Sequence, residues 1–451
     1  MLPIVSPAEM GAIDDAAPEP VEVLIGRAGA ALARTAVAML GGTYGRRVVV
    51  VAGKGNNGAD GMAAAGRLRA RGVGVTVLDA ASAPAVLPTA DLVIDAAFGT
   101  GFRGEWAAPD PGPAAVLACD IPSGVDGLTG EAHGARPADA TVTFAALKPG
   151  LLLAEGAELA GEVEVADIGL DVSSATAHLM TAAAAAALVP RRSYSSHKWQ
   201  RAVRLVAGSP GMRGAGRLCA SAALRAGAGM VVCSSPGVPS DQLDLPVEAV
   251  GRDLPGAGWV KEVLSDIDRF GVLAIGPGLG RDDSMLAAVR ELLVSAELPV
   301  VVDADGLAAL ADHPEVTRWR RSVTVLTPHD GEFAVLTGAS PAADRFDAVR
   351  QAARHFRSTV LLKGPTTLVA DHHGELVAVT SGDQRLATAG SGDVLTGIIA
   401  AMLDEGDRVG SVGAAAWVHG SAGARGPSAG LVAGDLPALA GDVVADLAAG
   451  G

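Results

Sequence analysis

Short apolar runs alternate with Gly-rich turns and amphipathic segments along most of the chain. From residue 46 the sequence reads RRVVVVAGKGNNGADGMAAAGRLRARGVGVTVLDA, with an apolar run on each side of a turn and an amphipathic segment. This order predicts a buried strand over 46–52, a helix ending near Arg71 and a strand over 73–79. Two strands joined by a crossover helix are parallel, so the pattern indicates an α/β fold.

Further apolar runs that lead into polar turns occur in both halves of the chain. In the first half they span 91–101, 115–124 and 140–150. In the second half, where a long helix is also predicted over 216–229, they span 202–209, 230–235, 272–278, 299–306, 323–329 and 359–371. Ligands of α/β folds bind at the carboxyl ends of the strands, so the polar turns are candidate binding segments.

The periodic pattern stops between the two halves. Residues 171–198 mix Ser, Ala, Pro and Arg without the alternation of a strand. A chain of 451 residues is long enough for two or more domains. We therefore expect a domain over 1–174, a linker over 175–195 and a second domain over 196–451.

Composition and charge disfavour several classes of protein. The formal net charge is −15 and aromatic residues make up 3% of the chain, which disfavours a nucleic-acid surface. The three cysteines (Cys119, Cys219, Cys233) have no paired spacing, so neither a disulfide framework nor a zinc site is expected. No signal peptide is recognised at the N-terminus, and the longest apolar stretch, 182–189, falls short of the ~20 residues that span a bilayer. We expect a cytoplasmic protein without a nucleic-acid or membrane partner.

One turn, TAGSGDVLTG at 388–397, combines an anion-binding pattern with a carboxylate. Glycines before an apolar helix predict backbone amides that face a phosphate, yet Asp393 would repel a resting anion, and no P-loop lysine follows. A carboxylate beside such amides suits phosphoryl transfer to an alcohol, with Asp393 as base and the amides of 390–392 as anion hole. The alternative is an aspartate that only caps a helix over 393–403.

Neighbouring turns of the second half carry compatible chemistry. LKGPTT at 362–367 ends a strand with a lysine and two threonines, which suit nucleotide phosphates unless Lys363 is an exposed strand-end residue. TPHDGEF at 327–333 spaces His329 and Glu332 three apart, as in half of a metal site or in a helix cap. GPGLG at 276–280 and DADGL at 303–307 are further turns at strand ends.

In this order, GPGLG, DADGL, LTPHDGEF, LKGPTT and ATAGSGDVLTGIIAAML resemble the ribokinase-like NAD(P)H-hydrate dehydratase domain over roughly 190–448. The resemblance implies a three-layer α/β/α fold in which ADP or ATP, with magnesium, phosphorylates the C6 hydroxyl of (S)-NADHX or (S)-NADPHX. Elimination of phosphate then regenerates the dinucleotide. It also implies that Asp393 is catalytic and binds the hydrate together with Ala215, Gly280 and His329. The implied nucleotide-binding residues are Lys363, Gly364, Pro365, Thr366, Thr367 and Gly392.

Three turns of the first half, GKGNNGADG (53–61), VIDAAFGTGFRGE (93–105) and CDIPSGVDGLTGE (119–131), place amides and carboxylates after strands. An Asn-Gly turn needs no function, but together the three resemble the NAD(P)H-hydrate epimerase domain (YjeF N-terminal type) over about 6–172. The resemblance implies a Rossmann-like three-layer α/β/α fold, proton transfer by Asp120, and potassium bound by Asn57, Asp95 and Ser123. The implied hydrate-binding residues are Asn56, Asn57, Gly58, Ala59, Asp60, Gly99, Thr100, Gly101, Phe102, Arg103, Gly104, Glu105 and Asp120.

The sequence thus predicts a bifunctional, homo-oligomeric repair enzyme acting on NADHX and NADPHX with an adenine nucleotide. Four positions depart from the family patterns, namely Arg27, Ala59, Trp199 and Asp330. The chain has five lysines, of which Lys54, Lys148, Lys198 and Lys363 lie in or beside the motifs. Two alternatives stay open: a kinase of a small alcohol such as a vitamin precursor, and a first half that only binds a ligand or dimerises.

Overall fold

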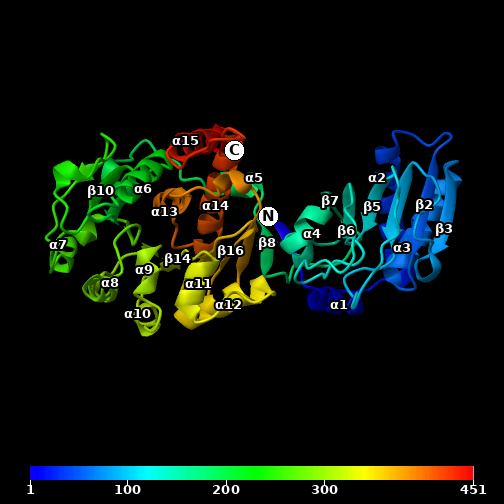
Figure 1. Ribbon diagram of the computed structural model, residues 1–451, viewed down its shortest axis with the longest axis horizontal. Helices are drawn as coiled ribbons and strands as arrows, with labels where there is room; N and C mark the ends of the chain where they lie inside the picture. The colour runs from blue at the N-terminus through cyan, green and yellow to red at the C-terminus, as the bar shows by residue number, and fades with distance from the viewer. Residues whose placement is uncertain (450–451) are drawn as a thin grey trace. The chain divides into compact units, whose positions relative to one another are not determined.

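The computed structural model describes residues 1–449 and divides into two compact units, Leu2–Thr176 and the chain from Ala177 onward (Figure 1). In both units parallel strands alternate with helices, which confirms the predicted α/β fold class. The boundary at residue 176 lies just beyond the predicted end of the first domain at 174.

The N-terminal unit is built on a six-stranded parallel sheet of order β3-β2-β4-β5-β6-β7. Val50, at the centre of β2, pairs with Val77 of β3 on one side and Ile94 of β4 on the other. Its six strands are β2 (Arg47–Ala52), β3 (Gly74–Asp79), β4 (Leu92–Ala96), β5 (Ala115–Cys119), β6 (Ala140–Phe144) and β7 (Glu162–Ala166), and the short β1 (Leu2–Ile4) lies outside this sheet. The helices are α1 (Pro7–Asp15), α2 (Val21–Leu40), α3 (Asn56–Ala70) and α4 (Ala154–Leu159).

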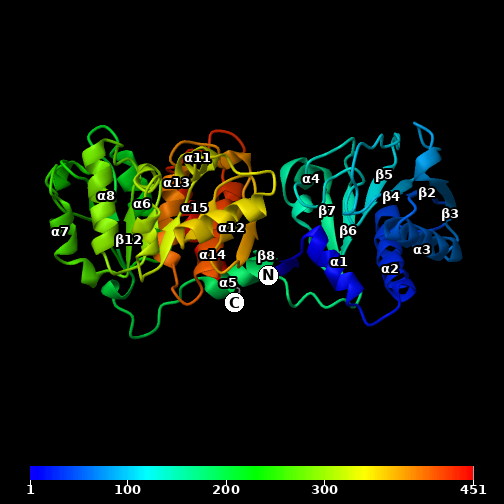
Figure 2. The same cartoon turned by 90° about the horizontal axis from the view of Figure 1, so that it is seen from below.

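Helices α2 and α3 lie side by side against one face of this sheet (Figure 2). Val48 and Val50 of β2 pack into the core beneath them, whereas Val49 and Val51 face a smaller cluster on the other side. The helices approach closely because position 29 is glycine: a Cβ there would lie 2.5 Å from that of Ala63. By length and composition α2 could cross a membrane, and it is a longer apolar segment than 182–189. Its apolar side is nevertheless part of this core.

The C-terminal unit has a larger sheet of order β8-β17-β16-β15-β14-β13-β12-β9-β10-β11, parallel except where β16 pairs with β15 and β17. Its strands are β8 (Ala177–Leu179), β9 (Ala202–Val206), β10 (Met230–Ser234), β11 (Val250–Gly251), β12 (Val272–Ile275), β13 (Val300–Val302), β14 (Thr324–Leu326), β15 (Thr359–Leu362), β16 (Thr367–Ala370) and β17 (Leu376–Val379). Its helices are α5 (Ala182–Leu188), α6 (Gly214–Arg225), α7 (Val260–Leu264), α8 (Asp283–Ser295), α9 (Asp305–Ala308), α10 (Glu315–Arg318), α11 (Asp330–Thr337), α12 (Arg345–Phe356), α13 (Ser391–Met402), α14 (Arg408–Arg425) and α15 (Leu436–Ala449).

Helices cover both faces of this sheet. Figure 1 shows α6, α13, α14 and α15 on one side, and α8, α10, α11 and α12 on the other. The core beneath the first group includes Val203 and Leu205 of β9, Val301 of β13 and Leu361 of β15. The three layers therefore place the carboxyl ends of β13, β14 and β15 and the start of α13 at one edge.

Three segments differ from the sequence predictions. The expected linker, 175–195, contains β8 and α5, because β8 pairs with β17 and α5 packs on α14. The single strand predicted over 359–371 is a hairpin of β15 and β16, turned at 363–366. The helix predicted over 393–403 starts earlier, at Ser391, with Gly390 as its N-cap, so Asp393 is not the capping residue.

Candidate active sites

A buried carboxylate organises the site of the C-terminal unit. Asp303 follows β13 and is 1% exposed. Its Oδ1 accepts hydrogen bonds from Lys363 Nζ at 2.9 Å and Thr327 Oγ1 at 2.7 Å, and its Oδ2 accepts one from Thr396 Oγ1 at 2.6 Å. Burial alone would raise the pKa of Asp303, but Lys363 and these hydrogen bonds bring it below its usual value. One charged group thus connects β13, β14, β15 and α13.

Asp393 lies in the first turn of α13 and is partly exposed at the same site. Burial, then the neighbouring charge of Asp303, raises the pKa of Asp393 to about 6, against the opposing effect of Lys363. Its helix is held against α6 by a close contact, since a Cβ at Gly397 would lie 2.2 Å from the carbonyl oxygen of Cys219. Cys219 Sγ in turn donates to the carbonyl oxygen of Asp393 at 2.9 Å. The fold therefore holds this carboxylate at the site with a pKa near neutrality.

Backbone amides at the start of α13 have the pattern of an anion hole. The Ser391 amide donates to the carbonyl oxygen of Thr388 at 3.2 Å, so it is engaged, contrary to the predicted hole over 390–392. Within residues 1–449, no acceptor is found for the amides of Gly392 and Asp393. A Cβ at Gly392 would lie 3.4 Å from Lys363 Nζ. Two donors and an ammonium group thus converge beside the carboxylate of Asp393.

The His329–Glu332 pair is a capping box rather than half of a metal site. His329 Nδ1 accepts from the amides of Gly331 and Glu332, and Glu332 Oε2 accepts from the amide of His329 at 2.9 Å. The same Glu332 oxygen lies 3.5 Å from Lys363 Nζ. The capping box therefore has two roles. It starts α11, and it places the carboxylate of Glu332 beside Lys363.

Other residues predicted from the family motifs lie around this site. Ala215 is at the start of α6, where a Cβ at Gly278 would lie 3.2 Å from its own Cβ. The Gly280 amide donates to Asp305 Oδ2 at 2.9 Å, and Asp305 contributes to the raised pKa of Asp393. In the predicted nucleotide-binding run, Gly364, Pro365 and Thr366 lie in the hairpin turn and Thr367 begins β16. Lys363 is ion-paired with Asp303 and Glu332 at this site and is not an exposed strand-end residue.

In the N-terminal unit, a second buried lysine holds a second aspartate. Asp120 follows β5 in the left-handed region (φ +67°), and its Oδ1 accepts from Lys148 Nζ at 2.6 Å and Thr143 Oγ1 at 3.0 Å. Lys148 is 1% exposed and also donates to Thr143 Oγ1 and to the carbonyl oxygen of Phe144. These contacts fix Oδ1 of Asp120 and leave Oδ2 for a ligand.

Asp120 and Lys148 line a cleft of about 530 Å³ that also receives Asp14 and Asp60. Asp60, in the first turns of α3, is 8% exposed. Burial raises the pKa of Asp60 to about 8, with further contributions from Asp120 and Asp14 that outweigh Lys148. Asp60 is therefore a protonated acid at neutral pH beside the ion-paired Asp120.

Beside this cleft lie the three residues predicted to hold potassium. Ser123 donates from Oγ to Asp95 Oδ1 at 2.6 Å and from its amide to Asp95 Oδ2 at 2.8 Å. Burial raises the pKa of Asp95 despite these hydrogen bonds. The Asn57 side chain is buried, and neither Oδ1 nor Nδ2 has a hydrogen-bond partner among the residues that the structure describes. An amide oxygen without a partner and a carboxylate on the neighbouring strand are ligands that a hard cation prefers.

Some of the remaining predicted residues of this unit line the cleft and others do not. Asn56, Asn57, Gly99, Thr100, Gly101 and Phe102 line the cleft. Gly58 is needed for the turn itself, because a Cβ there would lie 1.9 Å from the carbonyl oxygen of Gly53. The structure does not place Ala59, Arg103, Gly104 or Glu105 in the cleft lining.

The sequence analysis did not assign Lys148, Asp14 and Thr143 in the first unit, or Asp303, Thr327 and Thr396 in the second, to the sites, and it considered Glu332 only as a metal ligand or a helix cap. The scarcity of lysine was the one signal that pointed to Lys148. Three of the four departing positions have structural partners: Arg27 donates to the carbonyl oxygen of Ile168, Trp199 lies under Arg269, and Asp330 pairs with Arg345.

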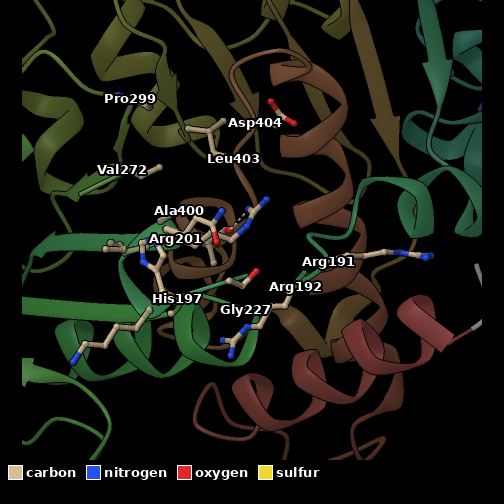
Figure 3. Close-up of a pocket in the computed structure, with 18 of the residues that line it drawn as sticks. Arg191, Arg192, His197, Arg201, Gly227, Val272, Pro299, Ala400, Leu403 and Asp404 are labelled. Carbon is tan, nitrogen blue, oxygen red and sulfur yellow. Dashed lines mark hydrogen bonds between the residues drawn. The ribbon is translucent and has the colours of Figure 1, made fainter. Parts of the chain in front are cut away.

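A cavity of about 500 Å³ at the opposite edge of the C-terminal sheet is separate from these sites. Figure 3 shows Arg201, His197 and Arg192 beside the amino ends of the strands, with Asp404 across from them. Arg201 Nη1 donates to the carbonyl oxygen of Ala401 at 3.3 Å. The cavity holds charges of both signs and none of the residues predicted from the motifs of the second half.

Two family models match the chain. One, described as NAD(P)H-hydrate dehydratase, matches residues 203–444, and the other, described as YjeF-related protein N-terminus, matches 21–85 and 78–150. The chain is 38% identical to a bifunctional NAD(P)H-hydrate repair enzyme from Moorella thermoacetica, over 96% of this chain and 95% of that protein. A relative of the same name from Mycobacterium tuberculosis is also 38% identical, over 83% and 82% of the two chains.

A solved structure is similar to the C-terminal unit. The ADP/ATP-dependent NAD(P)H-hydrate dehydratase from Bacillus subtilis, co-crystallised with ATP and Mg²⁺, has 29% sequence identity and a TM-score of 0.51. The match covers 60% of this chain and 98% of that one.

Replacing Lys363 tests the buried ion pair. Lys363→Ala leaves Asp303 charged and buried without its cation, so we expect a loss of about 3–5 kcal/mol in the free energy of unfolding. The exposed Lys261 is the control, and Lys261→Ala should change the free energy of unfolding by less than about 0.5 kcal/mol. Denaturant unfolding of both variants measures the difference. Equal, small effects would show that the Asp303–Lys363 pair does not stabilise this unit.

Replacing Asp60 tests its raised pKa. Above pH 3.8 the unfolded chain releases this proton while the folded protein keeps it up to about pH 8, so Asp60 makes stability fall across that range. Asp60→Asn removes the titration and should raise the melting temperature most near pH 8, with a smaller slope between pH 4 and 8. Thermal unfolding at several pH values measures this, with the exposed Asp15→Asn as control. An unchanged slope would place the Asp60 pKa near its ordinary value.

Proposed function

The chain belongs to the family of bifunctional NAD(P)H-hydrate repair enzymes, and we propose that its two units catalyse successive steps of this repair. The N-terminal unit interconverts the (R) and (S) hydrates of NADH and NADPH. The C-terminal unit dehydrates the (S) form with ADP or ATP as phosphoryl donor. The observation that carries the proposal is that each unit places an ion-paired aspartate beside a second carboxylate of raised pKa.

In the dehydratase unit, Asp393 is the proposed general base. It takes the proton of the C6 hydroxyl while that oxygen attacks the terminal phosphoryl group of the nucleotide. The free amides of Gly392 and Asp393 and the ammonium group of Lys363 face the charge that develops on this group. The C6–O bond then breaks, phosphate leaves with the C6 oxygen, and loss of a proton from C5 restores the double bond of the reduced nicotinamide ring.

A pKa of about 6 suits Asp393 to this task. A general base works best when its pKa lies near the working pH, because it is then both deprotonated and basic. Burial and the charge of Asp303 raise the pKa of Asp393, while the charge of Lys363 limits this increase. The ion pair at Asp303 therefore orients the site and tunes its base.

In the epimerase unit, we propose that Asp120 and Asp60 exchange protons with the hydrate in complementary roles. The ion pair with Lys148 supports Asp120 as the charged member, with Oδ2 available for the hydrate. Asp60 is protonated below about pH 8 and acts as the acid. Two carboxyl groups whose environments separate their protonation states are a common acid–base arrangement.

We propose that Asn57, Asp95 and Ser123 hold a potassium ion, because the amide oxygen of Asn57 has no partner among the described residues and Asp95 and Ser123 offer further oxygens after neighbouring strands. Such an ion would supply positive charge to an anionic ligand in the cleft. Magnesium is proposed to enter the other unit with the nucleotide, whose phosphates provide most of its ligands. A cytoplasmic location and assembly into a homo-oligomer stay predictions from the sequence.

Asp393→Asn tests the general base. It keeps the size of the side chain but removes the base, so dehydration should fall by about 10²–10⁴-fold while nucleotide still binds. The wild-type rate should rise with pH through about 6, as the carboxylate loses its proton. Absorbance of the reduced nicotinamide measures both. Asp404→Asn, beyond the other end of α13, is the control. Near wild-type turnover by Asp393→Asn would rule out this mechanism, and accumulation of a stable phosphate ester would favour a small-alcohol kinase.

Asp120→Asn tests the separation of the two activities. It keeps an oxygen for Lys148 but removes the proton acceptor, so a mixture of hydrates with ADP and magnesium should stop when the (S) form is consumed. The wild type should consume both. A fragment of residues 1–176, which form one compact unit, should exchange the epimers without nucleotide. Consumption of the (R) form by the variant at the wild-type rate would leave the first half as a binding module.

A further inference from the structure

A cavity of about 420 Å³ in the C-terminal unit is lined by a concentration of arginine unlike the rest of this acidic chain. The arginines are Arg318, Arg320, Arg321, Arg357 and Arg408. His372 and His373, from the turn between β16 and β17, also line it. No aspartate or glutamate belongs to its lining within the described part of the chain, residues 1–449. By contrast, the cavity of Figure 3 includes Asp404 and Glu405.

The arginine cavity lies at the opposite edge of the sheet from the dehydratase site. It includes Thr324 and Thr359, the first residues of β14 and β15. Thr327 and Lys363, which contact Asp303, follow the carboxyl ends of these same two strands. Since β14 and β15 are parallel, the two sites are on opposite edges. A ligand here is therefore separate from the nucleotide and the hydrate.

Three of the arginines are free to bind a ligand. Arg320 donates to the carbonyl oxygens of Ala296 and Leu298, and Arg318 to that of His355. The side chains of Arg321, Arg357 and Arg408, in contrast, have no hydrogen bond or ion pair with any residue that the structure describes. Arg321 and Arg357 are exposed and Arg408 is half-buried, and all three line the cavity, so their guanidinium groups can meet an anion from solution.

Two buried polar atoms in the cavity wall also lack partners. Thr359 is 1% exposed, and its Oγ1 has no hydrogen-bond partner among residues 1–449. The same is true of His372 Nδ1. Buried polar atoms are nearly always paired, and an unpaired hydroxyl is destabilising. Thr359 and His372 both line a cavity rich in arginine, so an anion that enters beside them would provide a hydrogen-bond partner for these atoms.

A metal ion fits this place less well. Donor atoms of Asp371, His372 and His373 lie within 4.8 Å of one another. However, Asp371 Oδ1 accepts from three backbone amides of its own turn, those of residues 373, 374 and 375. Burial and the charge of His373, followed by Arg408 and Arg357, lower the pKa of His372, against Asp371. The positive charges of Arg408 and Arg357, which contribute to this lowered pKa, also oppose a metal cation at this place.

We propose that this cavity binds the phosphate group of a small metabolite, with Arg357 and Arg408 as charged donors and Thr359 and His372 as buried hydrogen-bonding groups. Guanidinium groups and hydroxyls are the usual side-chain partners of phosphate. Trp319, 73% exposed, also lines the cavity and offers a face on which a planar ring can stack. The site is independent of the repair chemistry.

Calorimetric titration of the full-length protein with inorganic phosphate at low salt tests the proposal. Arg357→Ala/Arg408→Ala should weaken phosphate binding by about 10-fold or more, as expected when charged hydrogen bonds are removed. Arg34→Ala/Arg71→Ala, two exposed arginines of the other unit, is the control and should bind as the wild type does. The KM for ADP in the dehydratase reaction should stay unchanged in both, because neither pair lies at that site.

Thr359→Val separates binding from folding. It removes the unpaired hydroxyl at nearly constant size, so the melting temperature should stay or rise while phosphate binding weakens. AMP should bind more tightly than phosphate if Trp319 stacks on the base, and Trp319→Ala should then remove the difference. Equal affinities would identify the phosphate group alone as the ligand. Phosphate binding that is absent in the wild type, or unchanged in both the double arginine variant and Thr359→Val, would overturn the proposal.

Discussion

The C-terminal site depends on the buried ion pair between Asp303 and Lys363. A charged group removed from water is stable only when its hydrogen-bonding capacity is met, and Asp303 meets it with Lys363, Thr327 and Thr396. These partners come from three different segments, so satisfying one carboxylate fixes the ends of β14 and β15 relative to α13. The N-terminal unit also pairs an aspartate with a lysine, since the buried Lys148 contacts Asp120 and Thr143.

Beside each ion-paired aspartate lies a second carboxyl group whose pKa is raised. Asp393 and Asp60 are close to the paired aspartates but have no cation of their own, and their pKa values rise to about 6 and about 8. In both units the largest cause is burial, and the next is the charge of the paired aspartate. The same geometry that stabilises one negative charge therefore raises the pKa of its neighbour, as the proposed proton transfer requires.

Lysine and arginine contribute differently to the proposed sites. Lys148 is buried and Lys363 is half-buried, and each faces a carboxylate with a compact ammonium group that has three donors. At the amino ends of β14 and β15, Arg357 and Arg408 instead face an open cavity. Each proposed catalytic site thus contains one ion-paired lysine, whereas the cavity at the far edge of the sheet contains arginines.

The sequence by itself determined the two α/β halves, most of the strands and the turns that carry the motifs. These features follow from local periodicity and from the glycine or aspartate at each strand end, which only a few neighbouring residues decide. It did not show that 175–195 contains β8 and α5, or that 359–371 is a hairpin, because both depend on pairing with distant segments. The sequence did not show the ion pairs either, because their members are far apart along the chain. Lys148 is 28 residues from Asp120, and Lys363 and Thr396 are 60 and 93 residues from Asp303. Only the order of strands in the folded sheet brings such residues together, and with them the raised pKa values on which the chemistry depends.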